Sequence, residues 1–473
     1  MTDPVIVRLV AERDTIIDRL FAFVRHPSVG ADPAYADGMR GAQEFLLERL
    51  KGIGFSNVRR LEAGGYPAIY GEWLAAAGKP TFLVYGHYDV QPPDPVDKWA
   101  TPPFEPTVRN DRIYARGVSD DKGPSMIALE ALGAFLQVEG RLPVNVKVLL
   151  EGEEENGSAT FAQLCCRFRD VLAADAVISA DGARWRADLP TMNVASRGNK
   201  GLEFTVTTAS KDLHSGRYGG AIPNALHVIA DLVASFRDEW GSIVVEGFFD
   251  GVTPLTEEER DALTTIPFDE DAFYRQLETA PTGEPGYTTL ERLWLRPTLE
   301  LNGLWGGYTG PGSKTVIPSE AHGKITARLV PGQDPDRVER AIKDHLQRHC
   351  PPGARVTFGE SHGGSSAYLL PSDHPLLAAA EEALAATLGT WPLRVRMGAT
   401  LPMTDIIARE LGVHTVMFSF ATSDEDYHAP NEFFRLSSLD EGLSAWVTLL
   451  RLLGQQPAST YAGHWRAHEE PSN

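Results

Sequence analysis

Apolar runs that alternate with amphipathic helical segments constrain the fold of this chain more than any other sequence feature. Strand-like runs are expected at 68–73, 81–85, 144–150, 175–179 and 414–420. Helix-like segments are expected at 5–25, 41–51, 123–138, 159–171, 375–387, 402–411 and 437–453. Strands that alternate with helices are typical of an α/β fold in which helices cover a sheet.

The segment 198–374 has a different pattern and predicts a separate domain. An antiparallel strand is expected at 201–208 and a helix at 224–237, followed by an acidic loop rich in proline and glycine at 250–290. Strands at 321–329 and 355–358 then flank a helix at 335–349. Because 473 residues exceed the size of one ordinary core, we predict an α/β domain from 1–197 and 375–473 that is interrupted by an inserted α+β domain at 198–374.

The composition limits the partners of the protein. Its 44 basic and 64 acidic residues give a formal net charge of −20, which disfavours nucleic acid and anionic membranes as partners. No apolar run approaches the roughly 18 residues of a membrane span. Cys165, Cys166 and Cys350 show no C-x-x-C spacing, and the first residues lack the pattern of a signal peptide. We therefore expect a cytoplasmic protein without a disulfide framework.

Four carboxylates follow the expected strand 144–150 within five residues, in the sequence Glu151-Gly-Glu-Glu-Glu155. Carboxylates that converge in a dry pocket repel one another, and a divalent cation is the usual way to offset that repulsion. A solvated acidic loop is the alternative interpretation, because charge runs usually face water.

Histidines and acids also stand at the ends of other expected strands. His87 and Asp89 follow strand 81–85 and share one face of it, as an imidazole ligand and a carboxylate that orients it would. A salt-bridged histidine is the alternative. Asp120 and Asp121 precede a helix, where one of them could be only an N-cap and the other a metal ligand. Asp181 and His428 each follow a further strand. These strand ends are expected to meet at one edge of an α/β sheet, where such folds place their sites.

Five segments resemble a known family of hydrolases. They are Gly86-His-Tyr-Asp-Val, Gly117-Val-Ser-Asp-Asp-Lys-Gly-Pro, Glu151-Gly-Glu-Glu-Glu-Asn-Gly-Ser, Asp212-Leu-His-Ser-Gly and Tyr427-His-Ala-Pro-Asn-Glu. In this order they resemble the co-catalytic di-metal peptidases, which include carnosinase-like and cytosolic nonspecific dipeptidases, aminoacylase, carboxypeptidase G and succinyl-diaminopimelate desuccinylase. The Asp-Asp-Lys-Gly-Pro and Asp-Leu-His-Ser-Gly forms look most like the dipeptidase branch.

The resemblance implies a mixed-sheet, zinc-peptidase-like catalytic domain and an inserted lid and dimerisation domain. It implies two divalent metal ions per subunit, with zinc favoured and manganese or cobalt feasible. His87, Asp120 and Asp181 would bind one ion, and Asp120, Glu155 and His428 the other.

The resemblance also implies the roles of further residues. Glu154 would be the general base for a metal-bridging water, and Asp89 would orient His87. The inserted domain would supply His214, which stabilises the oxyanion in the partner subunit's site, and the substrate-binding residues Arg328, Thr315 and His362.

One segment departs from the family pattern. Arg396-Met-Gly-Ala-Thr-Leu-Pro stands where the family usually has Gly-Gly-Ser/Thr-Ile-Pro, although Gly398 and Thr400 remain at substrate-binding positions. Met397 and Ala399 are therefore expected to alter specificity rather than catalysis.

The expected activity is hydrolysis of a peptide bond next to a free carboxylate, in a dipeptide. An N-acyl-amino-acid deacylase or desuccinylase with the same di-metal site is the alternative. The full ligand set and Glu154 argue against a metal-free scaffold. The expected partners are a small peptide or N-acyl amino acid and a second copy of the chain.

Overall fold

The computed structural model describes residues 3–461, except for the side chain of His362, and forms two compact units. The first unit comprises Met1–Val194, Leu370–Val395 and Met403–Asn473, and the second comprises Ala195–Leu369 and Arg396–Pro402. The last residues of the predicted catalytic domain, 462–473, lie outside the described part. The domain limits and domain roles inferred from the sequence stay a prediction.

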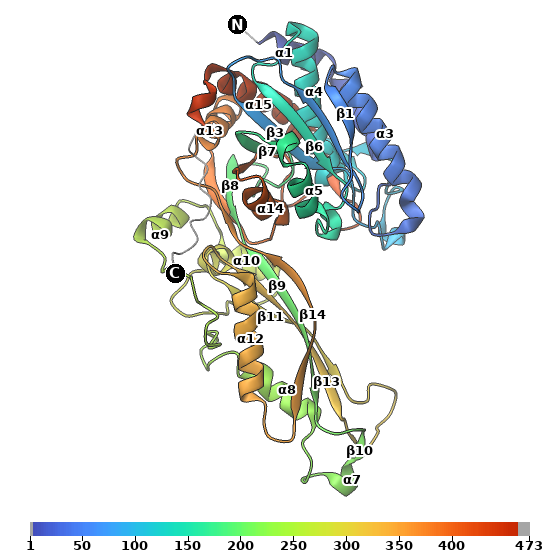
Figure 1. The fold of residues 1–473 in the computed structure, drawn as a ribbon, viewed down its shortest axis with the longest axis vertical. Helices are drawn as coiled ribbons and strands as arrows, with labels where there is room; N and C mark the ends of the chain where they lie inside the picture. The colour runs from blue at the N-terminus through green and yellow to red at the C-terminus, as the bar shows by residue number, and fades with distance from the viewer. Residues whose placement is uncertain (1–2, 462–473) are drawn as a thin grey trace. The chain divides into compact units, whose positions relative to one another are not determined.

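A mixed six-stranded sheet forms the centre of the first unit (Figure 1). In spatial order it contains β1 (Ser56–Leu61), β2 (Ala68–Trp73), β6 (Asn145–Glu151), β3 (Thr81–His87), β7 (Ala176–Ser179) and β17 (Thr415–Met417). The four strands from β6 to β17 are parallel, whereas β1 and β2 run antiparallel to their neighbours. The parallel strands therefore end at one edge of the sheet, which is where the predicted site residues follow.

Helices pack around this sheet. They are α1 (Pro4–Ala11), α2 (Arg13–Val24), α3 (Ala36–Gly52), α4 (Gly123–Glu139), α5 (Phe161–Arg167), α6 (Arg169–Leu172), α13 (Pro375–Leu388), α14 (Pro402–Glu410) and α15 (Leu436–Gln455). Phe161 of α5 and Met403 of α14 belong to one apolar cluster with Tyr85 and Leu149 of the sheet. Among the described residues, no helix is long and apolar enough to cross a membrane.

Two of the helices expected from the sequence are broken. The segment 5–25 forms α1 and α2, which meet at Glu12, and the segment 159–171 forms α5 and α6, which meet at Phe168. At both junctions the apolar spacing continues while the backbone leaves the helical region, so hydrophobic periodicity alone does not mark the break.

A small sheet of β4 (Thr107–Arg109), β5 (Arg112–Tyr114) and β18 (Phe433–Arg435) joins distant parts of the first unit. The backbone carbonyl of Glu432, just before β18, accepts a hydrogen bond from the amide of Ala115. This pairing brings the segment after His428 against the segment before Asp120.

The second unit contains a four-stranded antiparallel sheet of β11 (Thr298–Gly306), β13 (Glu320–Leu329), β9 (Gly198–Thr207) and β14 (Arg355–Ser365), in that order. Helices α8 (Ala225–Ala234) and α12 (Pro335–His349) pack on it through one apolar cluster that includes Phe204, Ile229 and Leu346. A short ladder pairs β10 (Leu213–His214) with β12 (Val316–Ile317), and α7 (Ser215–Tyr218) follows it. A further three-stranded sheet has the order β15 (Tyr368–Leu369), β8 (Thr191–Ser196) and β16 (Leu393–Met397).

The prediction of a loop at 250–290 is wrong in part. This segment contains α9 (Glu257–Thr264) and α10 (Glu270–Gln276), and α11 (Thr289–Trp294) begins at its end. Thr256 caps α9 in a capping box with Glu259, and Asp269 caps α10. These caps satisfy the first amides of two short helices whose apolar pattern is weak.

Candidate metal centre

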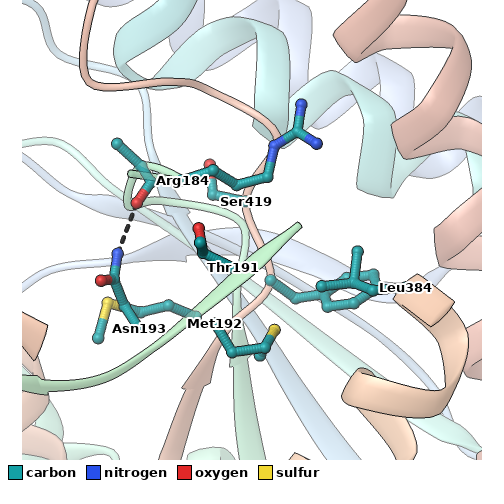
Figure 2. Close-up of a pocket in the computed structure, with 9 residues that line it drawn as sticks. Arg184, Thr191, Met192, Asn193, Leu384 and Ser419 are labelled. Carbon is teal, nitrogen blue, oxygen red and sulfur yellow. Dashed lines mark hydrogen bonds between the residues drawn. The ribbon is translucent and has the colours of Figure 1, made fainter. Parts of the chain in front are cut away.

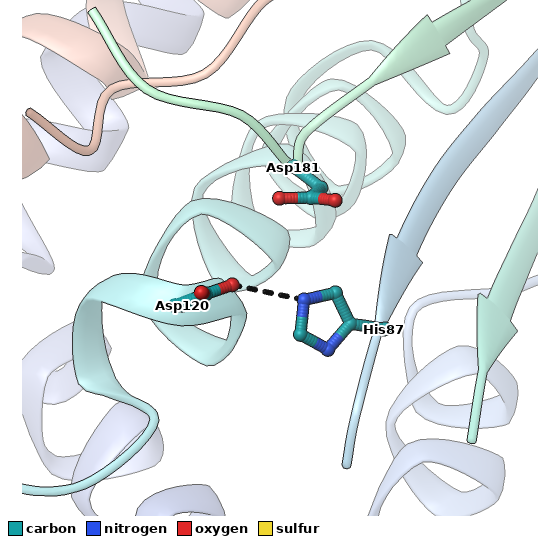
Figure 3. Close-up of side chains that lie close together, drawn as sticks. All are labelled: His87, Asp120 and Asp181. Atoms are coloured by element: carbon teal, nitrogen blue, oxygen red, sulfur yellow. Dashed lines mark hydrogen bonds and ion pairs between the residues drawn. The ribbon is translucent and has the colours of Figure 1, made fainter. Parts of the chain in front are cut away.

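The site begins at the end of β3, in the middle of the parallel part of the sheet. His87 is the last residue of β3, and both His87 and Asp89 are fully buried. The Nδ1 atom of His87 lies 3.1 Å from the carbonyl oxygen of Asp89 and 3.5 Å from its carboxylate. This contact fixes the ring so that Nε2 faces the carboxylate of Asp120, at 3.0 Å (Figure 3).

Asp89 also holds the segment that carries the acidic run. Its two carboxylate oxygens accept hydrogen bonds from the backbone amides of Glu154 (3.3 Å) and Glu155 (3.0 Å). One buried carboxylate therefore positions both His87 and the Glu154–Glu155 pair, which is how an orienting residue around a metal site acts.

Asp120 lies at the centre of the cluster. One of its carboxylate oxygens is 3.0 Å from Nε2 of His87, and the other is 3.1 Å from Nε2 of His428. Burial alone would raise the pKa of Asp120, but the hydrogen bonds from the two imidazoles outweigh burial and lower it. A carboxylate with both oxygens directed at different ligand groups can bridge two cations.

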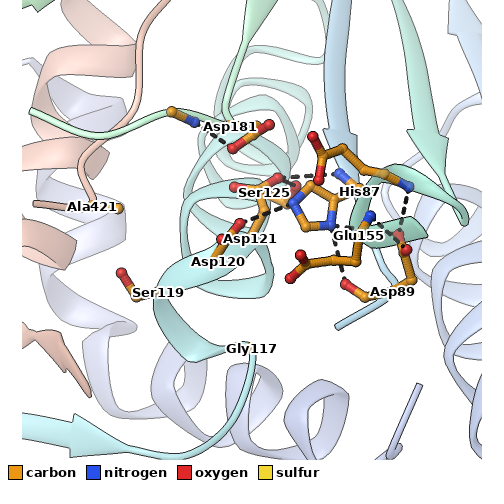
Figure 4. A network of polar contacts seen from close by, with 12 residues as sticks. His87, Asp89, Gly117, Ser119, Asp120, Asp121, Ser125, Glu155, Asp181 and Ala421 are labelled. Atoms are coloured by element: carbon orange, nitrogen blue, oxygen red, sulfur yellow. Dashed lines mark hydrogen bonds and ion pairs between the residues drawn. The ribbon is translucent and has the colours of Figure 1, made fainter. Parts of the chain in front are cut away.

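Asp121 does not join this cluster and is not a helix N-cap. Its Oδ2 accepts hydrogen bonds from the amide of His87 (3.2 Å) and from the Ser125 hydroxyl (2.7 Å), whereas Oδ1 has no hydrogen-bond partner among the residues that the structure describes (Figure 4). Burial raises the pKa of Asp121 well above its ordinary value. The peptide bond Asp120–Asp121 is cis.

Two groups of side chains have the composition and spacing of cation sites. The first group consists of His87, Asp120 and Asp181. The second consists of Asp120, Glu155 and His428. In each group the potential ligand atoms lie within 4.8 Å of one another. Figure 3 shows the first group, in which the Asp181 carboxylate points toward Asp120 and His87. Each group is the one that the resemblance implies, although the ligand roles themselves stay a prediction.

The electrostatics of these groups favour a cation. Burial raises the pKa of Asp181 to about 6 and also raises the pKa of Glu155, so both carboxylates lack enough positive charge around them. His428 lies 3.1 Å from both Asp120 and Glu155, and these hydrogen bonds raise its pKa to about 10. A set of imidazole nitrogens and carboxylate oxygens suits zinc and related divalent ions. The residues present therefore fit two divalent cations.

The four carboxylates of the acidic run have different surroundings. Glu151 is buried and accepts a hydrogen bond from the Tyr85 hydroxyl (2.6 Å). Glu153 accepts hydrogen bonds from the amide of Tyr66 and the hydroxyl of Thr160. Glu155 is part of the second ligand group. Glu154 is near enough to His87 and Asp181 for their charges to affect its pKa. The solvated-loop interpretation is therefore wrong, and Glu151 and Glu153 have partners outside the two ligand groups.

Glu432 supports the segment of Asp120 from behind, which the sequence reading missed. Its buried carboxylate binds the Arg116 guanidinium (2.8 Å) and accepts hydrogen bonds from the amides of Gly117 (2.8 Å), Ser119 (2.9 Å) and Asp120 (3.2 Å). The motif Tyr427-His-Ala-Pro-Asn-Glu contains this residue, but nothing in the spacing shows where its carboxylate points.

The predicted site residues of the second unit lie in two separate regions of that unit. His214 and Thr315 are neighbours in the β10–β12 region, where the amide of Ser215 donates to the carbonyl of Thr315 (3.0 Å). His214 is exposed and accepts a hydrogen bond on Nδ1 from the amide of Gly216. His362 pairs with Gly201 through the β14 backbone, and its side chain lies outside the described part.

Arg328 lies in the other region, on β13. It is next to segment 396–402, whose sequence differs from the family pattern. Its guanidinium donates a hydrogen bond to the Thr400 hydroxyl (2.7 Å). The carbonyl of Gly398 accepts a hydrogen bond from Nε of Arg197 (2.7 Å), and the carbonyl of Ala399 accepts one from the Arg197 amide (3.0 Å). The structure thus brings Arg328, Gly398 and Thr400 together, and adds Arg197, which the sequence reading missed.

A small pocket elsewhere in the first unit is not part of this site. It has a volume of about 10 Å³, room for one water molecule, and is lined by Arg184, Asn193 and Ser419 among others (Figure 2). None of the predicted site residues whose side chains are described lines this pocket.

Comparisons with known proteins agree with this geometry. Residues 83–452 match the model of peptidase family M20/M25/M40. The chain is 30% identical to the human Beta-Ala-His dipeptidase over 397 residues, which cover 82% of this chain and 78% of the relative. It is 28% identical to the Cys-Gly metallodipeptidase dug1 of Schizosaccharomyces pombe, with 93% of this chain and 96% of the relative covered.

A solved structure extends the likeness to the fold. An M20 family metallo-carboxypeptidase from Sulfolobus solfataricus superimposes with a TM-score of 0.82 and 31% sequence identity, over 93% of this chain and 99% of the other. The family match covers most of the chain and includes every predicted metal ligand. The protein is a metallohydrolase that belongs to peptidase family M20/M25/M40.

Proposed function

We propose that this protein hydrolyses dipeptides in a metal-dependent reaction. The observation that carries the proposal is the pair of ligand groups that share Asp120, with Glu154 beside them. The likeness to a Beta-Ala-His dipeptidase and to a Cys-Gly metallodipeptidase favours a dipeptide over an N-acyl amino acid as the substrate.

His87, Asp120 and Asp181 would hold one cation, and Asp120, Glu155 and His428 the second. Two such ions, when bound, acidify water and polarise a carbonyl group, so that hydrolysis proceeds at neutral pH. Zinc is the first choice for this ligand set, and manganese or cobalt are feasible because carboxylates predominate.

Glu154 would take a proton from the attacking water and deliver it to the leaving amine. Burial raises the pKa of its carboxyl group well above the ordinary value, and a raised pKa brings an acid–base residue closer to the operating pH. Asp89 would keep Glu154 and His87 in position through the contacts described above.

Arg328 and Thr400 would bind the free carboxylate of the substrate, because a guanidinium fork matches a carboxylate in geometry and charge. Their mutual hydrogen bond holds the guanidinium in place. His214, Thr315 and His362 are assigned to the oxyanion and the substrate by resemblance alone.

We also propose that the protein forms a homodimer through the second unit. Strand β11 is at one edge of the four-stranded sheet, and Leu301, Leu304 and Trp305 on it are 41–45% exposed. Unpaired edge strands with apolar side chains favour association with another chain. A cytoplasmic location stays a prediction; the three cysteines are free, as expected.

The test is incubation of the metal-loaded protein with a mixed pool of dipeptides and N-acyl amino acids, followed by mass spectrometry. We expect loss of dipeptides that a chelator suppresses, and no loss with Glu154→Gln. Loss of only the acylated compounds would replace the dipeptidase proposal with a deacylase. Turnover by Glu154→Gln would contradict the role of Glu154.

A further inference from the structure

The second unit contains a cavity of about 680 Å³ that is rich in arginine. Five arginines line it, which are Arg197, Arg237, Arg292, Arg296 and Arg328, against only two carboxylates, those of Glu284 and Glu300. We call it the arginine pocket. Such an excess of positive charge is unusual in a chain with a net charge of −20, and it attracts anions.

The two carboxylates do not neutralise this charge. Glu284 forms a bidentate ion pair with Arg296, with distances of 2.7 and 2.8 Å. Glu300 is 3.7 Å from Arg237, whose hydrogen bonds go to backbone carbonyl groups instead. Arg292 donates hydrogen bonds to the carbonyl oxygens of Thr282 and Glu284. Among the described residues, Arg197, Arg292 and Arg328 therefore form no ion pair with either carboxylate of the pocket.

Arg197 and Arg328 are the two arginines of the pocket that are most suited to bind an anion. Arg197 is half-buried, donates to the carbonyl groups of Gly398 and Arg296, and has no carboxylate within ion-pair distance among residues 3–461. Within the described part of the chain, the one hydrogen bond of the Arg328 guanidinium goes to the hydroxyl of Thr400. Burial and the neighbouring charge of Arg328 lower the pKa of Arg197 to about 10, although the charge of Glu300 acts in the opposite direction. Two neighbouring guanidinium groups that form no ion pair with a carboxylate among residues 3–461 are a suitable site for an anion.

The position beside Arg328 indicates which anion fits. Under the proposed function, on which this inference rests, Arg328 binds the terminal carboxylate of the dipeptide. A second guanidinium beside it matches a second carboxylate on the same residue. The cavity is far larger than one carboxylate needs, so it has room for a side chain.

We propose that the arginine pocket binds the acidic side chain of a C-terminal glutamate or aspartate. The protein then prefers dipeptides that end in these residues over those that end in glutamine or asparagine. Arg197 is the specificity-determining residue, and Arg292 adds to the positive charge of the pocket.

The test compares kcat/KM for Ala-Glu and Ala-Gln in the metal-loaded protein. Because a hydrogen bond to a charged group contributes more than one to a neutral group, we expect roughly a ten-fold or greater preference for Ala-Glu. Arg197→Met should remove most of this preference, Arg292→Met should reduce it, and Arg197→Lys should retain part of it. Lys324→Met removes an exposed cation of the same sheet outside the pocket, and it should leave the preference unchanged.

Arg197 also holds the segment 396–402, so its substitution could act through the structure alone. The ratio of kcat/KM for Ala-Glu to kcat/KM for Ala-Gln distinguishes a role in specificity from such a structural role. A purely structural role would lower kcat/KM for both dipeptides equally and leave the ratio unchanged. Equal rates on Ala-Glu and Ala-Gln in the wild type would overturn the inference while leaving the dipeptidase proposal intact.

Calorimetric binding of free glutamate and free glutamine tests the pocket without turnover. We expect tighter binding of glutamate, lost in Arg197→Met, and this result would support the pocket even if no dipeptide were hydrolysed and the proposed function failed. Binding of inorganic phosphate that exceeds glutamate binding and depends on Arg197 would contradict the assignment to an amino-acid side chain. Equal binding of glutamate and glutamine would contradict it too.

Discussion

Asp89→Asn is expected to lower metal affinity and kcat/KM without unfolding the protein. The carboxylate of Asp89 accepts hydrogen bonds from the amides of Glu154 and Glu155 and lies 3.5 Å from Nδ1 of His87. An asparagine of the same size can accept on one side only, because its NH₂ group faces a second N–H donor. The substitution therefore removes one hydrogen bond to a charged acceptor in a fully buried place.

Such a hydrogen bond contributes roughly 1.5–3 kcal/mol. This corresponds to a loss of about 10- to 100-fold, which is also the usual effect of removing a residue that orients a metal ligand. Zinc binding by competition with a chromophoric chelator gives the affinity, and initial rates with a dipeptide give kcat/KM. Asp188→Asn, at an exposed carboxylate that pairs with Arg186, is the matched control. Unchanged affinity and rate in Asp89→Asn would refute the argument that Asp89 positions His87 and the Glu154–Glu155 pair.

Three further substitutions test other parts of the account. Glu432→Gln leaves the buried guanidinium of Arg116 without its ion pair, so the free energy of unfolding in denaturant should fall by about 3–5 kcal/mol; no change would show that this pair does not support the segment of Asp120. Burial opposes ionisation of Glu339, but hydrogen bonds from Lys200 and two other side chains outweigh it and lower its pKa from 4.5 to about 2. This carboxylate therefore stabilises the folded state above its unfolded pKa, and the contribution is lost as the pH falls toward 2; Glu339→Gln should flatten the acid limb of a plot of stability against pH, and an unaltered limb would contradict this. Arg328→Met should abolish the preference for a dipeptide with a free carboxylate over its C-terminal amide; a preserved preference would place the carboxylate elsewhere.

The parallel strands explain why much of the site could be predicted from the sequence. His87 and Asp181 follow buried apolar runs, and parallel neighbours in a sheet end at the same edge. The order of the motifs along the chain was therefore enough to place both residues, with Glu155, at one edge. Composition and spacing did not reveal the separate partners of Glu151 and Glu153, because these depend on Tyr85, Tyr66 and Thr160.

Other features depend on contacts between distant segments and could not be read from local pattern. Glu432 reaches the amides of Gly117 and Ser119 only because β18 pairs with β5. Arg197 meets the carbonyl of Gly398 across about 200 residues of sequence. The helix α9, by contrast, was missed despite a local signal, the capping box of Thr256 and Glu259.

The most direct test of the central claim is a metal titration of the chelator-treated protein while the hydrolysis of one dipeptide is followed. We predict that activity is absent without metal and reaches its maximum at about two ions per subunit, since Asp120 belongs to both ligand groups. Glu154→Gln should bind the same number of ions and remain inactive. Full activity in the stripped protein, saturation at a single ion, or an active Glu154→Gln variant would contradict the account.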